Sequence, residues 1–319
     1  MATPSAPVFL QMFQADAAAV RAELVQGLTA QAAHVAPKFL YGPLGSVLFD
    51  AITLLDEYYP TRTEAAIFAA HADAMAGFCG TGRPLVDLGA GDCAKAASLF
   101  GALQPSQYVA VDISVAFLQQ ALTRLQQAFP ALPMLGLGMD FSRQLGLPAA
   151  VLPGPRTLFY PGSSVGNFTP DAALGLLRQV HDACDGGCLL LGVDLVKPAE
   201  VLQAAYDDAL GVTAAFNLNL LRNVNDLIGS DFDTRQWRHV AVFNAVQSRV
   251  EMHLEARAAL TVRWPGGERS FAAGERLHTE NSCKYRPDDF KALLHDAGFR
   301  DTRCWTDDKG WFAVFAARA

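Results

Sequence analysis

The chain has 319 residues, of which 51% are hydrophobic and 18% are charged, a balance that allows a large buried core and argues against disorder. Its formal net charge of −7 at pH 7 argues against a nucleic-acid-binding protein, which needs clustered Lys and Arg. The six cysteines lack the spacing and the partner histidines of a zinc site, so we expect reduced thiols and no bound metal.

The chain is expected to begin with a helix and an aromatic loop. Residues 1–14 lack the basic start and the apolar run of a signal peptide, and no segment reaches the roughly 20 apolar residues of a membrane span. We therefore expect a cytoplasmic protein without a membrane partner. Apolar residues at helical spacing predict a helix over 15–29. Aromatics and prolines make residues 35–62 loop-like, and a second helix is expected from Thr63, as N-cap, to residue 78.

Strands and helices alternate in the next part of the chain. The expected strands are 84–88, 108–112, 134–139, 156–160 and 188–196, and the expected helices are 93–102, 114–129 and 170–184. Such alternation predicts a parallel sheet with helices on both faces.

This alternation breaks after Lys197. Residues 198–229 are expected to be mostly helical. Residues 237–275 show apolar residues at every second position, which is typical of antiparallel strands. A segment of this kind does not continue a parallel sheet, so we interpret it as part of a second domain.

The C-terminal residues are expected to return to the first sheet. A helix at 287–297 and strands at 300–306 and 311–317 complete it. We therefore predict an α/β protein in which a Rossmann-like sheet carries an inserted α+β domain. The predicted boundaries are 58–197 and 284–319 for the sheet domain, and 8–57 and 198–283 for the second domain.

A glycine-containing turn follows the first expected strand, in the sequence Asp87-Leu88-Gly89-Ala90-Gly91-Asp92. Glycines at a strand-to-helix turn let a ligand approach the backbone, and ligands of parallel sheets bind at the carboxyl ends of the strands. Asp112 closes the second strand, where a carboxylate can accept hydrogen bonds from two ribose hydroxyls. The pattern fits two cofactors, because Gly89, Gly91 and Ala94 also satisfy the loose dinucleotide fingerprint.

Three further features favour S-adenosylmethionine (SAM) as the cofactor. No cluster of residues suggests hydride chemistry. Asp140 and Phe141 follow the third strand, where they suit the exocyclic amine and the ring face of adenine. A helix-capping or loop carboxylate is the alternative interpretation of Asp140. The expected antiparallel strand 311–317 is the usual last strand of a class I SAM methyltransferase.

Six other segments carry a more specific signal than the cofactor motif. They are Tyr41–Asp50, Glu57–Glu64, Gly162–Phe168, Tyr206–Asp208, Thr213–Asn217 and Glu280–Pro287. With these segments the chain resembles, from about residue 35 to its C-terminus, the L-histidine Nα-methyltransferases of ergothioneine biosynthesis. The resemblance implies a class I SAM-dependent enzyme with a substrate-binding insertion, which trimethylates the α-amino group of L-histidine to give hercynine.

The resemblance also implies a role for individual residues. SAM would be held by Tyr41, Gly89, Lys95, Asp112, Asp140 and Phe141. The amine and carboxylate of the amino acid would be held by Gly162, Ser164, Asn167 and Tyr206, with Asn167 and Tyr206 as the catalytic residues. The side chain of the amino acid would be surrounded by Tyr58, Met252, Glu280 and Ser282. The chain departs from the family at Asn281, where a small apolar residue is more usual, and this position bears on substrate choice.

The chemistry of methyl transfer suits these residue types. Displacement at a sulfonium needs a neutral amine in a fixed geometry, and positioning alone can lower a barrier by roughly 7–11 kcal/mol. Asn167 carries no charge that would favour the ammonium form, so we expect its oxygen to orient the amine and its NH2 group to hold the carboxylate. A neutral imidazole has one donor and one acceptor nitrogen. Glu280 can accept from the N–H, while Ser282 or Tyr58 donates to the other nitrogen.

Each of these residues also has a plain structural interpretation. Tyr58 and Met252 fit a hydrophobic core, and Glu280 fits a solvated ion pair with Lys284 or Arg286. Three other functions stay open: methylation of another aromatic amino acid, NAD-dependent oxidoreduction, and SAM binding without catalysis. We expect a monomer, because no interface helix is evident in the sequence.

Overall fold

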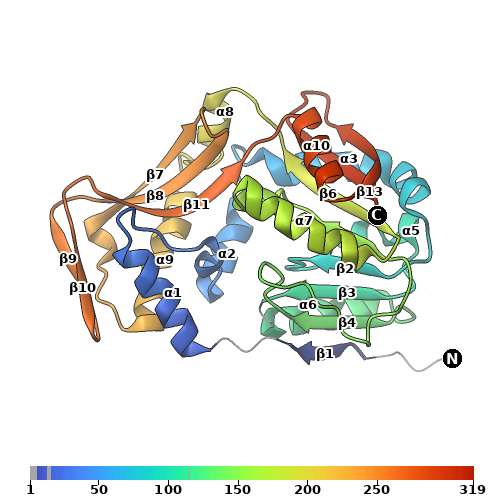
Figure 1. Ribbon diagram of the computed structural model, residues 1–319, viewed down its shortest axis with the longest axis horizontal. Coiled ribbons are helices and arrows are strands. Elements are labelled where there is room, and N and C mark those ends of the chain that lie inside the picture. The colour runs from blue at the N-terminus through green and yellow to red at the C-terminus, as the bar shows by residue number, and fades with distance from the viewer. Residues whose placement is uncertain (1–5, 13–15, 114) are drawn as a thin grey trace. The chain divides into compact units, whose positions relative to one another are not determined.

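The computed structural model describes residues 6–12, 16–113 and 115–319 (Figure 1). The chain divides into two compact units. Unit 1 contains residues 1–14, 62–195 and 285–319, and unit 2 contains residues 15–61 and 196–284. Residues 15 and 114, the expected first residues of two helices, lie outside the described residues. Nowhere in the described ranges is there a helix of the length and apolarity that crossing a bilayer requires.

Unit 1 contains an eight-stranded sheet in the order β1-β4-β3-β2-β5-β6-β13-β12. The strands from β1 to β6 in this order are parallel, whereas β13 runs antiparallel to both of its neighbours. The predicted parallel sheet with an antiparallel finish is therefore confirmed. The strands are β1 (Val8–Gln11), β2 (Leu85–Leu88), β3 (Tyr108–Asp112), β4 (Met134–Gly138), β5 (Thr157–Tyr160), β6 (Cys188–Asp194), β12 (Arg300–Thr306) and β13 (Phe312–Arg318).

The first strand differs from the expectation. Residues 8–11 pair with β4 as the edge strand of the unit 1 sheet, whereas the predicted boundary placed residues 8–57 in the second domain. The sequence gives little sign of this, because β1 has four residues, of which the two at its ends are exposed and the two at its centre are half-buried. Leu195 and Tyr285 flank the two ends of the inserted segment 196–284 and pair in an isolated parallel bridge. The chain therefore leaves and re-enters unit 1 at neighbouring points.

Helices cover both faces of this sheet. Apolar residues of α7 and α10 pack with one face, and those of α3, α5 and α6 pack with the other. Figure 1 shows α7 running roughly along the direction of the strands. The helical segments are α3 (Tyr59–Cys79), α4 (Ala94–Ser98), α5 (Phe100–Leu103), α6 (Val115–Ala128), η2 (Ser164–Asn167), α7 (Pro170–Cys184) and α10 (Pro287–Asp296).

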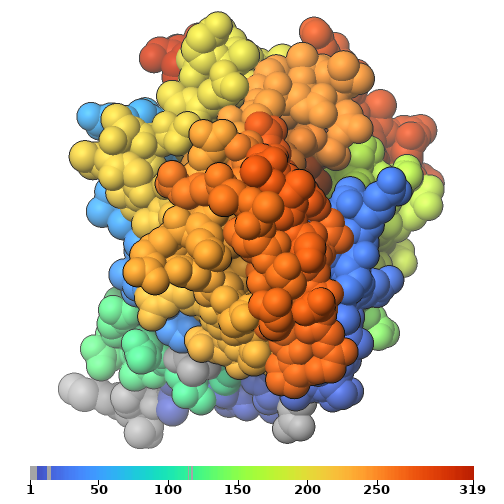
Figure 2. Space-filling model, turned by 90° about the vertical axis from the view of Figure 1, so that its left-hand side faces the viewer, coloured from blue at the N-terminus to red at the C-terminus, as the bar shows by residue number. Residues whose placement is uncertain are grey.

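Unit 2 is a mixed α+β unit. Helix α9 packs against β7, β8 and α2, and it forms much of the support for a three-stranded antiparallel sheet in the order β11-β8-β7. The orange segment of the chain, which contains these strands together with β9 and β10, makes up much of the surface seen in Figure 2. The elements are α1 (Ala17–Thr29), η1 (Pro37–Leu40), α2 (Pro43–Ile52), α8 (Ala199–Ala204), α9 (Val212–Ile228), η3 (Thr234–Gln236), β7 (Trp237–Asn244), β8 (Arg249–Ala256), β9 (Leu260–Trp264), β10 (Gly267–Phe271) and β11 (Arg276–Cys283).

Residues 35–62 are more helical than expected. Pro37 and Pro43 stand in the first turns of η1 and α2, and Pro60 stands in the first turn of α3, which begins at Tyr59 rather than at Thr63. A proline fits there because the first N–H groups of a helix have no intrahelical partner and the fixed φ suits the helix. The expected loop was wrong because these prolines start helices instead of interrupting them.

Candidate active site

The loops that follow adjacent parallel strands bring several predicted residues to one edge of the unit 1 sheet. Gly89 follows β2, Asp112 ends β3, Asp140 follows β4 and Gly162 follows β5, and these four strands are neighbours in the sheet. The carboxyl edge of a parallel sheet is the usual place for a nucleotide ligand. The structure therefore groups the predicted cofactor residues of unit 1.

The glycine turn leaves space for a ligand beside its backbone. Gly89 and Gly91 have φ angles of +74° and +53°, and no atom outside the turn lies within 4 Å of the position that a Cβ would take. The Gly91 N–H donates to the carboxylate of Asp112 over 3.2 Å. Asp112 is half-buried, which leaves part of its carboxylate accessible. An open glycine turn beside a fixed carboxylate fits the ribose of an adenosine cofactor.

A buried carboxylate that sequence reasoning missed lies below this turn. Asp87 is 1% exposed, and the Tyr108 hydroxyl donates to one of its oxygens over 2.8 Å. Burial raises the pKa of Asp87 to about 7, although the Tyr108 hydrogen bond opposes that shift. Its other oxygen has no partner among the described residues. The sequence signal was an acidic residue inside an otherwise apolar strand.

A second missed carboxylate, Glu64 of α3, joins two of the predicted site residues. Its side chain is fully buried and forms an ion pair with Lys95 over 2.7 Å. Its other oxygen accepts the Gly162 N–H over 2.8 Å. A Cβ on Gly192 would lie 1.9 Å from this oxygen, so only glycine lets the carboxylate reach its place against β6. Lys95 and Gly162 are thus held by Glu64.

The loop after β5 presents an amide side chain without a partner. Ser163, at a φ of +57°, accepts the Asp194 N–H on its hydroxyl over 2.8 Å, and Ser164 donates to the Pro161 carbonyl over 3.3 Å. Asn167 ends the 3-10 helix η2 and is half-buried. Its side-chain amide has no hydrogen-bond partner among the described residues, so both of its polar atoms are available to a ligand.

Asp140 and Phe141 are held by their own surroundings. The Ser142 hydroxyl donates to Asp140, and the Arg143 guanidinium lies 3.5 Å from the other oxygen of this carboxylate. The ring of Phe141 meets that of Tyr160 edge to face, with 5.7 Å between the ring centroids. These contacts fix both side chains, and they agree with either interpretation of Asp140.

Unit 2 contains a pocket with aromatic walls. Four predicted substrate residues line it, and so does Tyr41, which the resemblance assigned to SAM. The centroid of the Tyr41 ring lies 5.5 Å from those of Phe49 and Phe216, and the Tyr58 and Tyr206 rings lie 6.4 Å apart. The cavity volume is about 20 Å³, room for about one water molecule. Its lining residues are Tyr41, Phe49, Ile52, Tyr58, Ala205, Tyr206, Thr213, Phe216, Met252 and Glu280.

Glu280 brings a buried carboxylate into this pocket. It is 7% exposed, and among the described residues it has neither a hydrogen bond nor an ion pair. The alternative of a solvated ion pair with Lys284 or Arg286 is therefore wrong. Burial raises the pKa of Glu280 to about 7, although the charge of Lys284 lowers it in part. An unpaired buried acid is unfavourable unless a ligand supplies the missing donor.

A buried lysine that sequence reasoning missed organises two neighbouring hydroxyls. Lys284 is 2% exposed and donates to the Tyr206 hydroxyl over 3.0 Å and to the Ser282 hydroxyl over 2.7 Å. The Tyr206 hydroxyl in turn donates to Ser282 over 2.7 Å. Because Ser282 accepts from both neighbours, its own proton points to a third group. Elsewhere, no group of three His, Cys, Asp or Glu side chains in the described ranges could hold a metal ion.

Comparison with known proteins gives consistent matches over nearly the whole chain. A family model described as histidine-specific methyltransferase, SAM-dependent, matches residues 20–319. The histidine N-alpha-methyltransferase of Mycolicibacterium smegmatis is 40% identical, with 94% of this chain and 95% of that protein covered. Ergothioneine biosynthesis protein 1 of Neurospora crassa is 30% identical over 84% of this chain and 31% of that protein. A solved structure from Bordetella parapertussis, 14% identical, shares the fold with a TM-score of 0.50 over 95% of each chain.

Proposed function

Because the chain belongs to the family of histidine-specific, SAM-dependent methyltransferases, we propose that it methylates the α-amino nitrogen of L-histidine. We place this reaction in ergothioneine biosynthesis and propose three successive transfers, which yield hercynine. Each transfer consumes one neutral amine and one SAM, breaks the methyl–sulfur bond, forms one N–C bond and releases S-adenosylhomocysteine. The first two transfers also release a proton, whereas the third leaves a quaternary ammonium that has no proton to lose. No metal or redox cofactor is needed to balance this reaction.

The unpaired carboxylate of Glu280 is the observation that carries the proposal. It lies in a pocket with aromatic walls, and a neutral imidazole has one N–H donor to offer it. A hydrogen bond to a charged group contributes about 1.5–3 kcal/mol, and a ring without a donor leaves the acid unpaired at a further cost. The Ser282 proton, which Lys284 and Tyr206 leave uncommitted, suits the second ring nitrogen. Together these groups favour histidine over phenylalanine.

The amine is assigned to Asn167. Its free side-chain oxygen can accept from the amine, and its NH2 group can donate to the substrate carboxylate. Neither atom carries a charge, so this contact does not favour the ammonium form, which has no lone pair for displacement. SAM, when bound, supplies an electrophilic methyl group on a sulfonium. The chain positions the amine of the substrate. A nitrogen lone pair that already lies in line with the methyl–sulfur bond needs no further reorientation before it reacts.

The remaining assignments rest on the family resemblance and are supported by the contacts described above. We propose that Gly89, Asp112, Asp140 and Phe141 bind the adenosine part of SAM, and that Lys95 acts on this site with Glu64. Tyr41 would contact SAM from the wall of the aromatic pocket. Gly162 and Ser164 would bind the backbone of the amino acid with Asn167 and Tyr206, while Tyr58, Met252, Glu280 and Ser282 surround its ring.

Three further properties belong to the same proposal. We propose a monomer that acts in the cytoplasm and binds no nucleic acid. The negative net charge supports the absence of nucleic-acid binding, and the six cysteines, none of which forms a disulfide, support the cytoplasm. Light scattering at several concentrations tests the monomer, and a concentration-dependent doubling of mass contradicts it.

Product analysis tests the proposed function directly. The purified chain is incubated with SAM and one amino acid from a panel of histidine, tryptophan, tyrosine and phenylalanine. Mass spectrometry then measures the mass of each product. We expect histidine to gain three methyl groups and the other amino acids to react slowly. A faster reaction with tryptophan, whose indole also offers an N–H, assigns the enzyme to another substrate.

The cofactor is tested separately by thermal stability. A ligand that binds the folded state raises the melting temperature, so SAM and S-adenosylhomocysteine should stabilise the protein and NAD should not. Stabilisation by NAD alone contradicts the proposal. Stabilisation by SAM without any methylated product identifies a binding protein instead of an enzyme.

A further inference from the structure

The strand that carries Glu280 contains one extra residue. In the pairing of β11 with β8, His278 lies opposite His253, while Glu280 lies opposite Met252, so Thr279 is inserted between two adjacent positions of the partner strand. This is a β-bulge, a feature that re-aims side chains and is common beside active sites. Thr279 is fully buried.

The bulge decides which face of the sheet carries Glu280 and Ser282. Side chains alternate along a strand, so a regular strand in which Thr279 paired like any other residue would place 278, 280 and 282 on one face. His278 shares the face of His253, which is opposite to the face of Met252. After the bulge, Glu280 and Ser282 share the Met252 face, and Met252 lines the aromatic pocket. If Thr279 were paired in a regular ladder instead of bulged, both side chains would point away from it.

The buried side of the bulge is pinned by Thr279 itself. Its hydroxyl donates to the Met252 carbonyl over 3.0 Å. A bulge interrupts the regular ladder of backbone hydrogen bonds, and a buried carbonyl that loses its partner is unfavourable. The Thr279 hydroxyl therefore satisfies a carbonyl at the point where the ladder is disturbed. Met252, whose side chain faces the ring of the substrate in our proposal, is held by the same bond.

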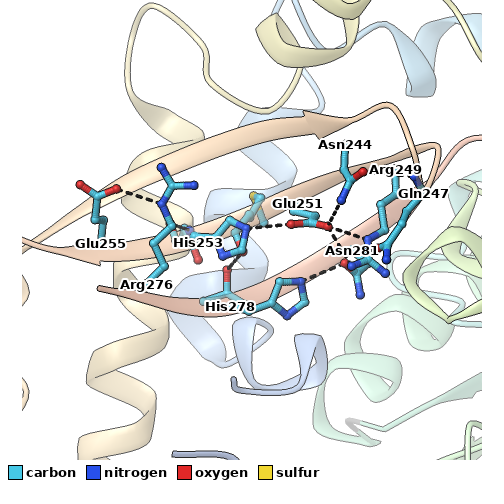
Figure 3. A network of polar contacts seen from close by, with 12 residues as sticks. Asn244, Gln247, Arg249, Glu251, His253, Glu255, Arg276, His278 and Asn281 are labelled. Atoms are coloured by element: carbon cyan, nitrogen blue, oxygen red, sulfur yellow. Dashed lines mark hydrogen bonds and ion pairs between the residues drawn. The ribbon is translucent and has the colours of Figure 1, made fainter. Parts of the chain in front are cut away.

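The outer side of the bulge is closed by a second hydrogen bond. His278 and Asn281 both lie on the outer face, three positions apart, because the bulge stands between them, and their side chains bond over 2.9 Å. An amide oxygen only accepts, so the His278 Nε2 carries the proton. Burial lowers the pKa of His278, which keeps the ring neutral although Asn281 opposes the shift. Figure 3 shows this pair beside the polar network of the same face.

That network stabilises the partner strand but does not span the bulge. Glu251 of β8 accepts hydrogen bonds from Arg249 over 2.8 Å and from Asn244 over 3.0 Å, and it lies 3.1 Å from the Nε2 of His253 (Figure 3). Asn244 and Asn281 are thus two amides on one face of one sheet. Only Asn281 connects the residues on either side of Thr279, so Asn244 is a matched control.

We propose that Thr279 and the His278–Asn281 pair are positioning residues that aim Glu280 and Ser282 into the pocket, and so set the preference for an imidazole ring. This rests on the proposed function, since it concerns how that substrate is selected. It also accounts for the polar residue at position 281, whose side chain takes no place in the pocket wall. Asn281 supports the substrate-reading residues from the opposite face.

Binding measurements on matched variants test the proposal. Thr279→Val keeps the shape of the side chain and removes its hydroxyl, and Asn281→Leu removes the outer bond. We expect the dissociation constant of histidine to rise about tenfold in the first and about threefold in the second, as loss of one hydrogen bond implies. S-adenosylhomocysteine should bind both variants as it binds the wild type. The ratio of kcat/KM for histidine to that for phenylalanine should fall in step.

Three controls separate positioning from a general loss of structure. Thr279→Ser and Asn281→Asp keep the donor and the acceptor, so both should bind histidine as the wild type does. Asn244→Leu removes an equal amide outside the bulge and should leave selectivity unchanged. The proposal is overturned if Thr279→Val and Asn281→Leu keep wild-type selectivity, if Asn244→Leu lowers it equally, or if S-adenosylhomocysteine binding weakens along with histidine binding. If the wild type does not methylate histidine, the proposed function itself fails before any variant is compared.

Discussion

Two buried glutamates, Glu64 of unit 1 and Glu280 of unit 2, differ in whether a partner compensates the charge of the carboxylate. Glu64 of unit 1 is bonded to the Lys95 ammonium and to the Gly162 N–H, so both of its oxygens have partners. Glu280 of unit 2 is nearly as buried and has no such partner among the described residues. A satisfied buried charge fixes the loops around it, whereas an unsatisfied one is unfavourable, and we propose that Glu280 is compensated by a ligand. This contrast distinguishes Glu64, which holds neighbouring loops in place, from Glu280, which we propose binds the substrate. It does not depend on any comparison with relatives.

The same contrast applies within unit 1. The side chains that hold the loop after β5, such as Ser163 and Glu64, are bonded to backbone groups. Asn167, at the end of that loop, has an amide that is bonded to no described residue. By the criterion that distinguishes Glu280 from Glu64, we propose that Asn167 is the residue of this loop that contacts the substrate. Mutations at these three positions should therefore have different signatures.

The largest effect is expected at Asn167. Asn167→Asp replaces the uncharged side-chain amide by a carboxylate, which favours the ammonium form of the substrate. The kcat should therefore fall about 100-fold, as it does when a reacting group is misplaced. Single-turnover rates measure the change, and the dissociation constant of S-adenosylhomocysteine is the control, because the cofactor does not depend on this contact. Turnover at the wild-type rate would show that Asn167 does not orient the amine.

Glu280→Gln should reduce kcat/KM for histidine roughly 10- to 100-fold, which corresponds to the loss of one charged hydrogen bond. Competition between histidine and phenylalanine measures the change, and the preference should relax toward the apolar ring. An unchanged preference would remove Glu280 from the recognition of the ring.

The same variant should gain stability at high pH. The pKa of Glu280 is raised from 4.5 to about 7 in the folded chain, so the folded state holds a proton that the unfolded state has lost. This contribution is complete below pH 4.5 and is lost as the pH rises through 7. Glu280→Gln avoids that loss, so its free energy of unfolding, relative to the wild type, should increase between pH 5 and pH 8 by up to roughly 3 kcal/mol. Urea unfolding at both pH values measures it.

Glu64→Gln should have the opposite sign. It weakens the bonds to Lys95 and Gly162, so the free energy of unfolding should fall by about 2 kcal/mol at pH 8, where Glu280→Gln is stabilising. The effect stays modest because the Lys95 side chain is 36% exposed and water screens the ion pair. If both glutamine variants changed the free energy of unfolding in the same direction at pH 8, the proposed difference between a structural Glu64 and a substrate-binding Glu280 would be wrong.

A smaller effect on substrate use than that of Glu280→Gln is expected at Lys284. Lys284→Met removes the donor that Tyr206 and Ser282 share, so the KM for histidine should rise about tenfold while the cofactor still binds. Lys291→Met is the control, because Lys291 is a partly exposed lysine bonded to Asp288 on the surface of unit 1. If both variants have the same KM, Lys284 has no part in orienting the two hydroxyls.

Periodicity was sufficient to predict the strands of the unit 1 sheet other than the edge strand β1, but it did not predict the local details that orient individual side chains. Alternating apolar segments predicted β2 to β6 and the antiparallel β13, because a buried strand needs apolar residues on both faces. The bulge at Thr279 could not be predicted, since the residues around it are all polar and show no change of phase. Glu64 was missed for a similar reason, because one acid in a helix usually faces solvent.

The pairing of Leu195 with Tyr285 has a consequence for the history of such enzymes. The segment that carries Tyr206, Met252 and Glu280 starts and ends at neighbouring points of the unit 1 sheet. Insertions, deletions or wholesale replacement between these points need not strain the strands on either side. Evolution could therefore remodel the choice of acceptor molecule while leaving the methyl-donor machinery nearly untouched.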